Sequence, residues 1–429
     1  MKSMSAAKIK ADVVVVGGGA SGMMAAASAA ESGLKVVLVE KNSKLGRKLR
    51  ITGKGRCNLT NDCDVKTIIE NVPKNGRFLY SALNGLSPTD TIELFEGCGL
   101  PLKTERGRRV FPVSDSAQDV VNVLEGMLKS TGVIVKKADV KGILTKNNIC
   151  LGVSASDGDI YAKSVILCTG GLSYPKTGST GGGHRMLKEL GHNITECCPS
   201  LVPLESSDDF CAEMQGFSLR NIALSVVDDR NETVFCEQGE MLFTHFGVSG
   251  PLVLSASAHM RGFGKRRYKL SIDLKPALDE KKLDMRILRD FQKYSNREFK
   301  NALGDLAGRV MIPVLIERSG IPGETKVNAV SKVQRLGLVK LFKAFEVDII
   351  GTRPIDEAIV TSGGLSVKEV NPKTMESKLV SGLYIAGELL DVDGYTGGFN
   401  LQIAWSTGRQ AGKSAADGAR LACEIPDAD

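Results

Sequence analysis

A run of glycines directly after an apolar segment constrains the fold of this chain more than any other feature. Residues 12–16 (DVVVV) are β-rich, and residues 17–22 (GGGASG) then fit the pattern G-x-G-x-x-G. The alanine- and methionine-rich residues 20–32 predict a helix, and residues 34–40 predict a second strand. A strand, a glycine turn, a helix and a second strand make one βαβ half-unit. We therefore expect an α/β fold with a parallel sheet.

The glycine turn has the sequence context of a dinucleotide-binding site. Glycines let the backbone approach a pyrophosphate, and the N-terminus of the following helix presents unpaired N–H groups to it. Glu40 ends the second strand eighteen residues after Gly22, where a carboxylate can accept hydrogen bonds from ribose hydroxyls. A purely structural glycine turn is the alternative, and the full context argues against it.

Basic residues crowd into the sixteen residues that begin just after this unit. They are Lys41, Lys44, Arg47, Lys48, Arg50, Lys54 and Arg56. A solvated surface loop is one interpretation, and a loop that faces phosphate is the other, favoured by its position after the nucleotide motif. The whole chain carries a net charge of only +7. That charge is too mild to indicate nucleic acid, so we predict no nucleic-acid partner.

Two more glycine-rich segments follow predicted buried strands. Thr169 and Gly170 follow one strand, where small residues let the backbone pass close to a flat or phosphorylated ligand, although a structural turn explains them equally well. Gly387 and Glu388 follow the other, where a carboxylate can bind sugar-chain hydroxyls. Residues 397–400 (GGFN) then lead into a predicted helix, whose N–H groups can face developing negative charge such as that of a reduced flavin.

The middle of the chain differs in character from both ends. Residues 199–275 alternate in a strand-like way, and residues 279–345 are more helical and charged. The ten cysteines form no C-x-x-C and no zinc spacing, so we expect reduced cysteines, no metal and a cytoplasmic protein. No run of eighteen apolar residues occurs, so we expect no membrane association.

These features resemble flavoproteins with two dinucleotide-binding motifs, and more closely the bacterial family of BaiN-like flavoproteins. The resemblance runs nearly end to end and is most specific in GRKLRITGKGRCNLTN (46–61), GLSYPKTGSTGGG (171–183), GEMLFTHFGVSGP (239–251) and LYIAGELLDVDGYTGGFNLQIAWSTG (383–408). It implies a Rossmann-like FAD-binding domain built from both chain ends, 1–195 and 377–429. The inserted part would be a β-rich domain, 196–279 and 350–376, with a helical subdomain, 280–349.

The resemblance also implies which residues would surround FAD. The pyrophosphate would contact Gly17, Gly19, Ala20 and Ser21. The adenosine ribose would bind Glu40, and adenine would contact the backbone of Val140. Lys41, Arg47 and Lys48 would lie beside the nucleotide. The flavin would lie near Thr52 and Gly53, with Glu388 on the ribityl chain and Asn400 and Leu401 facing the ring. Gly182 departs from the family pattern, which usually has an acidic residue there. That departure puts a hydrogen bond in doubt but not the FAD site.

Three side chains are candidates for a catalytic role. Tyr174 and Tyr395 lie in the two glycine-rich loops expected beside the flavin, and a tyrosine hydroxyl can donate a proton to a carbanion or hold an enolate oxygen. His245 lies in the inserted part, where substrate should approach. A polar loop histidine without a chemical role is the alternative for His245.

The resemblance implies a reductase of carbon–carbon double bonds conjugated to a carbonyl, because the family includes gut-bacterial reductases of unsaturated 3-oxo bile-acid intermediates. Its substrate would be a small molecule of bile-acid or steroid metabolism. NAD(P)H would be the electron donor, and it would bind only transiently because no second G-x-G-x-x-G motif occurs. The alternative is an FAD-dependent amine oxidase of the aminoacetone type that uses oxygen. A third interpretation is a non-enzymatic flavoprotein that binds RNA or a partner through the basic loop.

Overall fold

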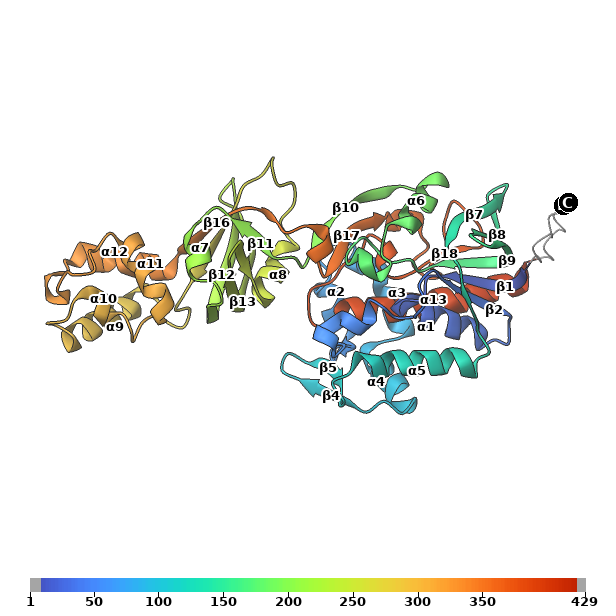
Figure 1. Ribbon diagram of the computed structural model, residues 1–429, viewed down its shortest axis with the longest axis horizontal. Coiled ribbons are helices and arrows are strands. Elements are labelled where there is room, and N and C mark those ends of the chain that lie inside the picture. Colours follow the sequence, from blue (N-terminus) through green and yellow to red (C-terminus); the bar gives the residue numbers. More distant parts are fainter. Residues whose placement is uncertain (1–8, 423–429) are drawn as a thin grey trace. The chain divides into compact units, whose positions relative to one another are not determined.

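The computed structural model describes residues 9–422, which form two units. The nucleotide-binding unit consists of the described residues up to Ser200 together with those from Ile355 onward. The inserted unit is Leu201–Pro354. Figure 1 shows the elements of each unit.

The nucleotide-binding unit is built on a seven-stranded sheet with the order β6-β2-β1-β9-β8-β7, in which β18 also pairs with β9. The strands are β1 (Ile9–Val16), β2 (Val36–Glu40), β6 (Ile134–Lys137), β7 (Val140–Lys146), β8 (Ile149–Ala155), β9 (Gly158–Leu167) and β18 (Leu383–Ile385). The strands β6, β2, β1, β9 and β18 pair in parallel, whereas β7 and β8 form an antiparallel arm. One continuous strand, β9, pairs with β8 through its first residues and with β1 along most of its length.

Valines dominate the centre of this sheet because both of its faces are covered. Val13, Val14 and Val15 of β1 are fully buried, as expected for a parallel strand between layers of helices. The helices and short strands of this unit are α1 (Ala20–Ala30), α2 (Val65–Glu70), α3 (Tyr80–Gly85), α4 (Pro88–Gly97), α5 (Ala117–Ser130), α6 (Gly182–Glu189), α13 (Phe399–Leu421), β3 (Thr60–Asn61), β4 (Leu102–Glu105), β5 (Arg109–Pro112), β10 (Ile194–Ser200) and β17 (Val360–Leu365). The predicted Rossmann-like α/β domain is confirmed.

The first helix and the last helix of the nucleotide-binding unit pack against each other through glycines (Figure 1). A Cβ on Gly408 of α13 would lie 2.4 Å from the carbonyl oxygen of Ser21 in α1, and one on Gly412 would lie 2.4 Å from that of Ala25. Both distances are too short for any side chain. The two chain ends are thus joined directly behind the glycine turn.

The inserted unit contains a closed barrel with the strand order β11-β14-β13-β12-β15-β16. Its elements are β11 (Leu204–Ser206), α7 (Phe210–Glu213), β12 (Ser218–Asp228), β13 (Thr233–Thr244), β14 (Gly247–Ser249), α8 (Pro251–Ser257), β15 (Tyr268–Asp273), α9 (Glu280–Lys293), α10 (Phe299–Ala302), α11 (Ile312–Ser319), α12 (Lys332–Lys343) and β16 (Phe345–Thr352). We use the term helical subdomain for residues 280–343, which lie between β15 and β16. One hydrophobic core runs through the barrel and these helices.

Candidate functional site

The glycine turn between β1 and α1 leaves open space where the helix begins. Gly17 has φ +103°, and a Cβ there would lie 2.5 Å from the carbonyl oxygen of Cys168. A Cβ on Gly22 would lie 1.8 Å from the carbonyl oxygen of Gly17. In contrast, no atom lies within 4 Å of the Cβ position of Gly19, the N-cap of α1. Packing requires two of the glycines, and the third opens a helix N-terminus, which fits the pyrophosphate of a dinucleotide.

Glu40 ends β2 with its carboxylate held in place by neighbouring donors. Its Oε2 accepts the N–H of Gly18 at 2.7 Å, and its Oε1 accepts the N–H and the side-chain amide of Asn42 at 2.8 and 2.6 Å. Arg47 donates to Asn42 Oδ1 at 2.7 Å. Carboxylate oxygens have further lone pairs, so Glu40 can still accept from ribose hydroxyls. Asn42 was not singled out from the sequence, although its position two residues after the strand-end acid is a usable signal.

Most of the basic run is engaged by neighbours within the nucleotide-binding unit. Lys41 Nζ donates to Thr180 Oγ1 at 2.9 Å, and Arg50 Nη2 lies 3.5 Å from Glu125 Oε1. Arg56 forms ion pairs with two carboxylates on other segments. The run therefore ties its loop to the rest of the unit, and three of its seven cations, Lys48, Arg50 and Arg56, are paired with carboxylates.

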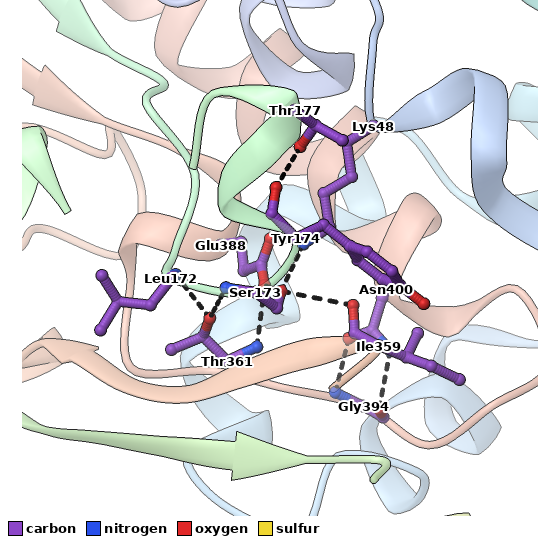
Figure 2. A network of polar contacts seen from close by, with 10 residues as sticks. All are labelled: Lys48, Leu172, Ser173, Tyr174, Thr177, Ile359, Thr361, Glu388, Gly394 and Asn400. Carbon is purple, nitrogen blue, oxygen red and sulfur yellow. Dashed lines mark hydrogen bonds and ion pairs between the residues drawn. The ribbon is translucent and has the colours of Figure 1, made fainter. Parts of the chain in front are cut away.

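Lys48 and Glu388 form the centre of a polar cluster, which we call the Lys48–Glu388 cluster (Figure 2). Lys48 Nζ lies 2.6 Å from Glu388 Oε2 and donates to Ser173 Oγ at 2.6 Å. Glu388 Oε1 accepts the Ser173 hydroxyl at 3.0 Å and the N–H of Thr361 at 2.8 Å. The cluster thereby joins the loops that follow β2, β9 and β18. This is how three strand ends of one sheet come together.

The Glu388 carboxyl stays ionised in this setting. Burial raises its pKa, but the Lys48 ammonium and the hydrogen bonds from Lys48, Thr361 and Ser173 outweigh burial and leave the pKa below its usual value. The Lys48 and Glu388 side chains remain 24% and 21% exposed, so solvent reaches the pair. A charged, partly accessible carboxylate is a suitable acceptor for the hydroxyls of a ribityl chain.

Ser173 and Thr361 are the members of this cluster that sequence reasoning missed. The Thr361 hydroxyl accepts the N–H groups of Leu172 and Ser173 at 2.7 and 3.0 Å, and it therefore holds the loop after β9 in place. Ser173 lies inside the GLSYPKTGSTGGG stretch, so a signal for it was present. Thr361 is a buried strand residue with no motif around it.

The turns after β9 and β18 also approach other backbone segments closely. A Cβ on Gly183 would lie 2.0 Å from Thr169 Oγ1, and Gly170 has φ +72°. Gly387 has φ +73°, and a Cβ there would lie 2.4 Å from Ser21 Oγ in the first turn of α1. The third glycine-rich segment thus lies against the first.

The remaining predicted FAD residues lie at several places in the nucleotide-binding unit. Thr52 and Gly53 form a kink in the 3-10 segment Leu49–Gly55, where Gly53 has φ +57°. Val140 is the first residue of β7 and is buried, and Leu401 packs against the core of the unit.

Asn400 holds the loop that precedes α13. Its Oδ1 accepts the N–H of Gly394 at 2.8 Å, and its Nδ2 donates to the Gly394 carbonyl oxygen at 2.7 Å (Figure 2). Its Nδ2 also lies 3.3 Å from the Tyr395 carbonyl oxygen, to which it donates. Gly398, the N-cap of α13, has φ +101°, and a Cβ there would lie 2.3 Å from the Thr60 carbonyl oxygen. The Asn400 side chain therefore shapes the loop, and the helix N-terminus offers the backbone N–H groups.

The two tyrosines expected to act in catalysis lie in the nucleotide-binding unit. Tyr174 has φ +51°, and Lys48 Nζ lies 6.0 Å from the centre of its ring. The N–H of Tyr395 donates to the Asn71 carbonyl oxygen at 2.9 Å, and its own carbonyl accepts from Asn400. His245 belongs to the inserted unit, where it is exposed in the turn between β13 and β14.

Gly182 begins α6, and no atom lies within 4 Å of its Cβ position. Its departure from the expected acidic residue is therefore not caused by crowding.

Within residues 9–422, no group of three or more His, Cys, Asp or Glu side chains could hold a metal ion. No helix among the same residues is long and apolar enough to cross a membrane.

Comparison with known proteins identifies the family. Residues 11–414 match the family described as HI0933-like protein Rossmann domain. The chain belongs to this family. It is 32% identical to the 3-dehydro-bile acid delta(4,6)-reductase of Clostridium scindens over 90% of this chain and 94% of that protein. It is also 30% identical to the ribosomal RNA dihydrouridine synthase of Escherichia coli, over 88% of this chain and 91% of that protein.

A solved structure of E. coli quinol fumarate reductase FrdA has a similar fold, with a TM-score of 0.53 at 16% identity over 98% of this chain and 72% of that one. At this identity the similarity concerns the fold alone. The family match, together with a glycine turn whose geometry suits a dinucleotide, identifies this HI0933-like chain as an FAD-dependent oxidoreductase, as the sequence predicted.

Proposed function

We propose that this chain is an NAD(P)H-supplied reductase of carbon–carbon double bonds conjugated to a carbonyl. One observation carries the proposal. Two relatives, each at least 30% identical over nearly the whole chain, have names that describe the same chemical change on different molecules. A delta(4,6)-reductase and a dihydrouridine synthase both add two hydrogens across a double bond conjugated to a carbonyl.

The reaction balances as a two-electron reduction. A hydride adds to the β carbon, or to the δ carbon of an extended dienone, and the electron pair of the double bond moves toward the carbonyl oxygen. A proton then adds to the α or γ carbon, and NAD(P)H becomes NAD(P)⁺. Bound FAD supplies the hydride relay between the nicotinamide and carbon. The protein must supply donors for the carbonyl oxygen and an acid for the carbon.

A tyrosine hydroxyl can fill either of these two roles. Lys48 Nζ of the Lys48–Glu388 cluster lies 6.0 Å from the centre of the Tyr174 ring. Tyr395 precedes the α13 N-terminus, whose N–H groups can face developing negative charge. We propose Tyr174 and Tyr395 as the proton donor and the carbonyl-oxygen donor, and His245 as the third candidate.

An unsaturated 3-oxo bile acid or steroid is the first substrate class that we propose, because the bile-acid reductase shares 32% identity. The uracil ring of RNA is the second, because the dihydrouridine synthase shares 30% identity and the helical subdomain is basic. The amine oxidase remains the alternative reaction.

Anaerobic photoreduction followed by separate mixing tests this proposal. The reduced holoenzyme is mixed with a 4-en-3-one steroid, a uridine-containing RNA hairpin, or oxygen, and reoxidation of the flavin is followed by absorbance. We expect a conjugated carbonyl compound to reoxidise the flavin faster than oxygen does. Rapid reoxidation by oxygen alone, together with steady-state oxidation of aminoacetone, would establish the oxidase instead.

A further inference from the structure

The net charge of the chain is concentrated in one small region. The helical subdomain, residues 280–343, contains fourteen lysine and arginine residues and seven aspartate and glutamate residues. Its net charge is therefore +7, which equals the net charge of all 429 residues. The mild overall charge conceals a strongly basic subdomain.

Six of these cations have no side-chain hydrogen bond, ion pair or aromatic-ring contact among the described residues. All six are exposed: Lys281, Arg289, Arg309, Lys326, Lys332 and Lys340. The other basic residues of the subdomain include several that are paired, such as Arg286 with Asp290 and Lys343 with Asp273. The unpaired cations are therefore available to an external anionic partner.

Four of the six lie on the outward faces of α9 and α12. In α9, helical spacing places Lys281, Met285, Leu288 and Arg289 on the face opposite the buried side chains. In α12, the same spacing places Val333, Leu336 and Lys340 outward. Lys332 begins α12 beside them.

An ion pair holds these two helices together. Arg335 Nε lies 2.6 Å from Asp284 Oδ1. Asp284 is within one turn of Lys281 and Leu288, and Arg335 is within one turn of Lys332. The pair therefore brings the two rows of cations into one neighbourhood. We call Lys281, Met285, Leu288, Arg289, Lys332, Val333, Leu336 and Lys340 the α9–α12 surface.

We propose that the α9–α12 surface binds the phosphate backbone of structured RNA. Unpaired lysine and arginine side chains along neighbouring helices neutralise successive phosphates, and release of counterions drives such binding. Exposed aliphatic side chains between the cations can contact sugar edges, because A-form RNA presents a wide and shallow minor groove. This proposal concerns binding and does not depend on the reaction proposed above.

An anionic membrane would be the competing partner for a basic surface, and the packing of the helices argues against it. A helix that lies in a membrane interface inserts its apolar face. Here the apolar faces are already occupied: Leu283, Ile287 and Phe291 of α9 and Leu338 and Phe342 of α12 are buried in the subdomain core. The exposed aliphatic side chains form only one pair on each helix, Met285 with Leu288 and Val333 with Leu336, and cations flank both pairs.

The test compares two charge-reversed variants of the FAD-loaded full chain. The surface variant carries Lys281→Glu, Arg289→Glu and Lys332→Glu. Its matched control carries Lys66→Glu, Lys129→Glu and Lys373→Glu, which are exposed positions in the nucleotide-binding unit. Both variants have the same net charge. Lys281→Glu and Lys332→Glu fall in the first turn of a helix, where an acidic side chain stabilises the helix. The surface variant should therefore fold, and a loss of RNA binding would not be caused by unfolding.

Binding is measured by fluorescence anisotropy with a labelled RNA hairpin that has a stem of about 20 base pairs, a length that spans two successive minor grooves. We expect the surface variant to bind the hairpin at least about tenfold more weakly than wild type. We also expect the slope of log Kd against log salt concentration to decrease by up to about three, because three phosphate contacts are lost. We expect the control to resemble the wild type.

Several outcomes would overturn the proposal. They are failure of the wild type to bind the hairpin, equal weakening in both variants, and binding only to phosphatidylserine vesicles. Flavin absorbance and reduction of a 4-en-3-one should be the same in both variants. If no conjugated carbonyl compound is reduced but the RNA result holds, the proposed reaction fails and the binding surface stands.

Discussion

The basic run after β2 and the helical subdomain are both rich in lysine and arginine, yet the structure uses them differently. In the basic run, Lys41, Lys48 and Arg56 contact side chains from distant segments of the nucleotide-binding unit. In the helical subdomain, Lys281 and Lys332 are exposed and have no partner among the described residues. Density of charge along a sequence therefore does not show whether that charge is internal or available, because its partners can lie hundreds of residues away.

The same difference bears on where RNA could bind. The basic loop was the region that the sequence suggested for an RNA-binding flavoprotein. Five of its seven cations contact other groups of the nucleotide-binding unit, whereas six exposed cations of the helical subdomain have no side-chain hydrogen bond, ion pair or aromatic-ring contact among the described residues. If this comparison is correct, substitutions of the engaged residues in and around the basic run should affect FAD binding or stability, and substitutions on the α9–α12 surface should affect neither.

The largest effect should come from the glycine turn. Gly17→Ala places a Cβ 2.5 Å from a carbonyl oxygen at a residue with φ +103°. Such a clash costs about 3 kcal/mol or more, so we expect the purified variant to lack FAD or to misfold. Gly19→Ala is the matched control, since nothing lies within 4 Å of its Cβ position. It should fold but hold FAD less tightly. Normal flavin absorbance in Gly17→Ala would contradict the assignment of this turn.

Glu40→Ala should weaken FAD affinity about tenfold to a hundredfold. A hydrogen bond to a charged group contributes roughly 1.5–3 kcal/mol, and the ribose hydroxyls would lose this acceptor. The measurement is titration of the apoprotein with FAD by flavin fluorescence. Asn42→Ala should weaken binding less, because it removes only donors that orient the carboxylate. An unchanged affinity in Glu40→Ala would mean that another residue holds the ribose.

Lys48→Met should destabilise the nucleotide-binding unit by roughly 1–3 kcal/mol, because Glu388 would keep its charge without its cation. Thermal unfolding of the apoprotein measures the loss. The double variant Lys48→Met/Glu388→Gln should recover part of it, because the remaining amide is neutral. A double variant that is less stable than the single one would show that the pair does not act as a unit.

The low pKa of Glu388 predicts how stability depends on pH. The folded-state pKa lies below the unfolded value of about 4.3, so the cluster stabilises the fold above that pH. This contribution is lost as pH falls through the folded-state pKa. Between pH 6 and pH 3, the melting temperature of wild type should therefore fall more than that of Glu388→Gln. Parallel curves would show that the carboxylate does not depend on Lys48.

Sequence reasoning was most successful where a local pattern has one physical cause. The β1–α1–β2 unit follows from a glycine turn between a valine-rich strand and an alanine-rich helix, and both chain ends meet in one domain as expected. Thr361 and the role of Asn400 could not be predicted, because their partners are brought close only by folding. The basic nature of the helical subdomain was visible in the sequence, but averaging over 429 residues concealed it.

The smallest effect on stability should come from the α9–α12 surface, and this is the sharpest test of the comparison. The variant Lys281→Glu/Arg289→Glu/Lys332→Glu reverses three charges, whereas Lys48→Met removes one. Exposed side chains without partners contribute little to folding, so we expect a change in melting temperature of less than about 2 °C and an unchanged FAD content. Differential scanning calorimetry of both variants in the same buffer decides the matter. If the triple variant melts as far below wild type as Lys48→Met does, the cations of the helical subdomain are structural and the contrast between the two regions fails.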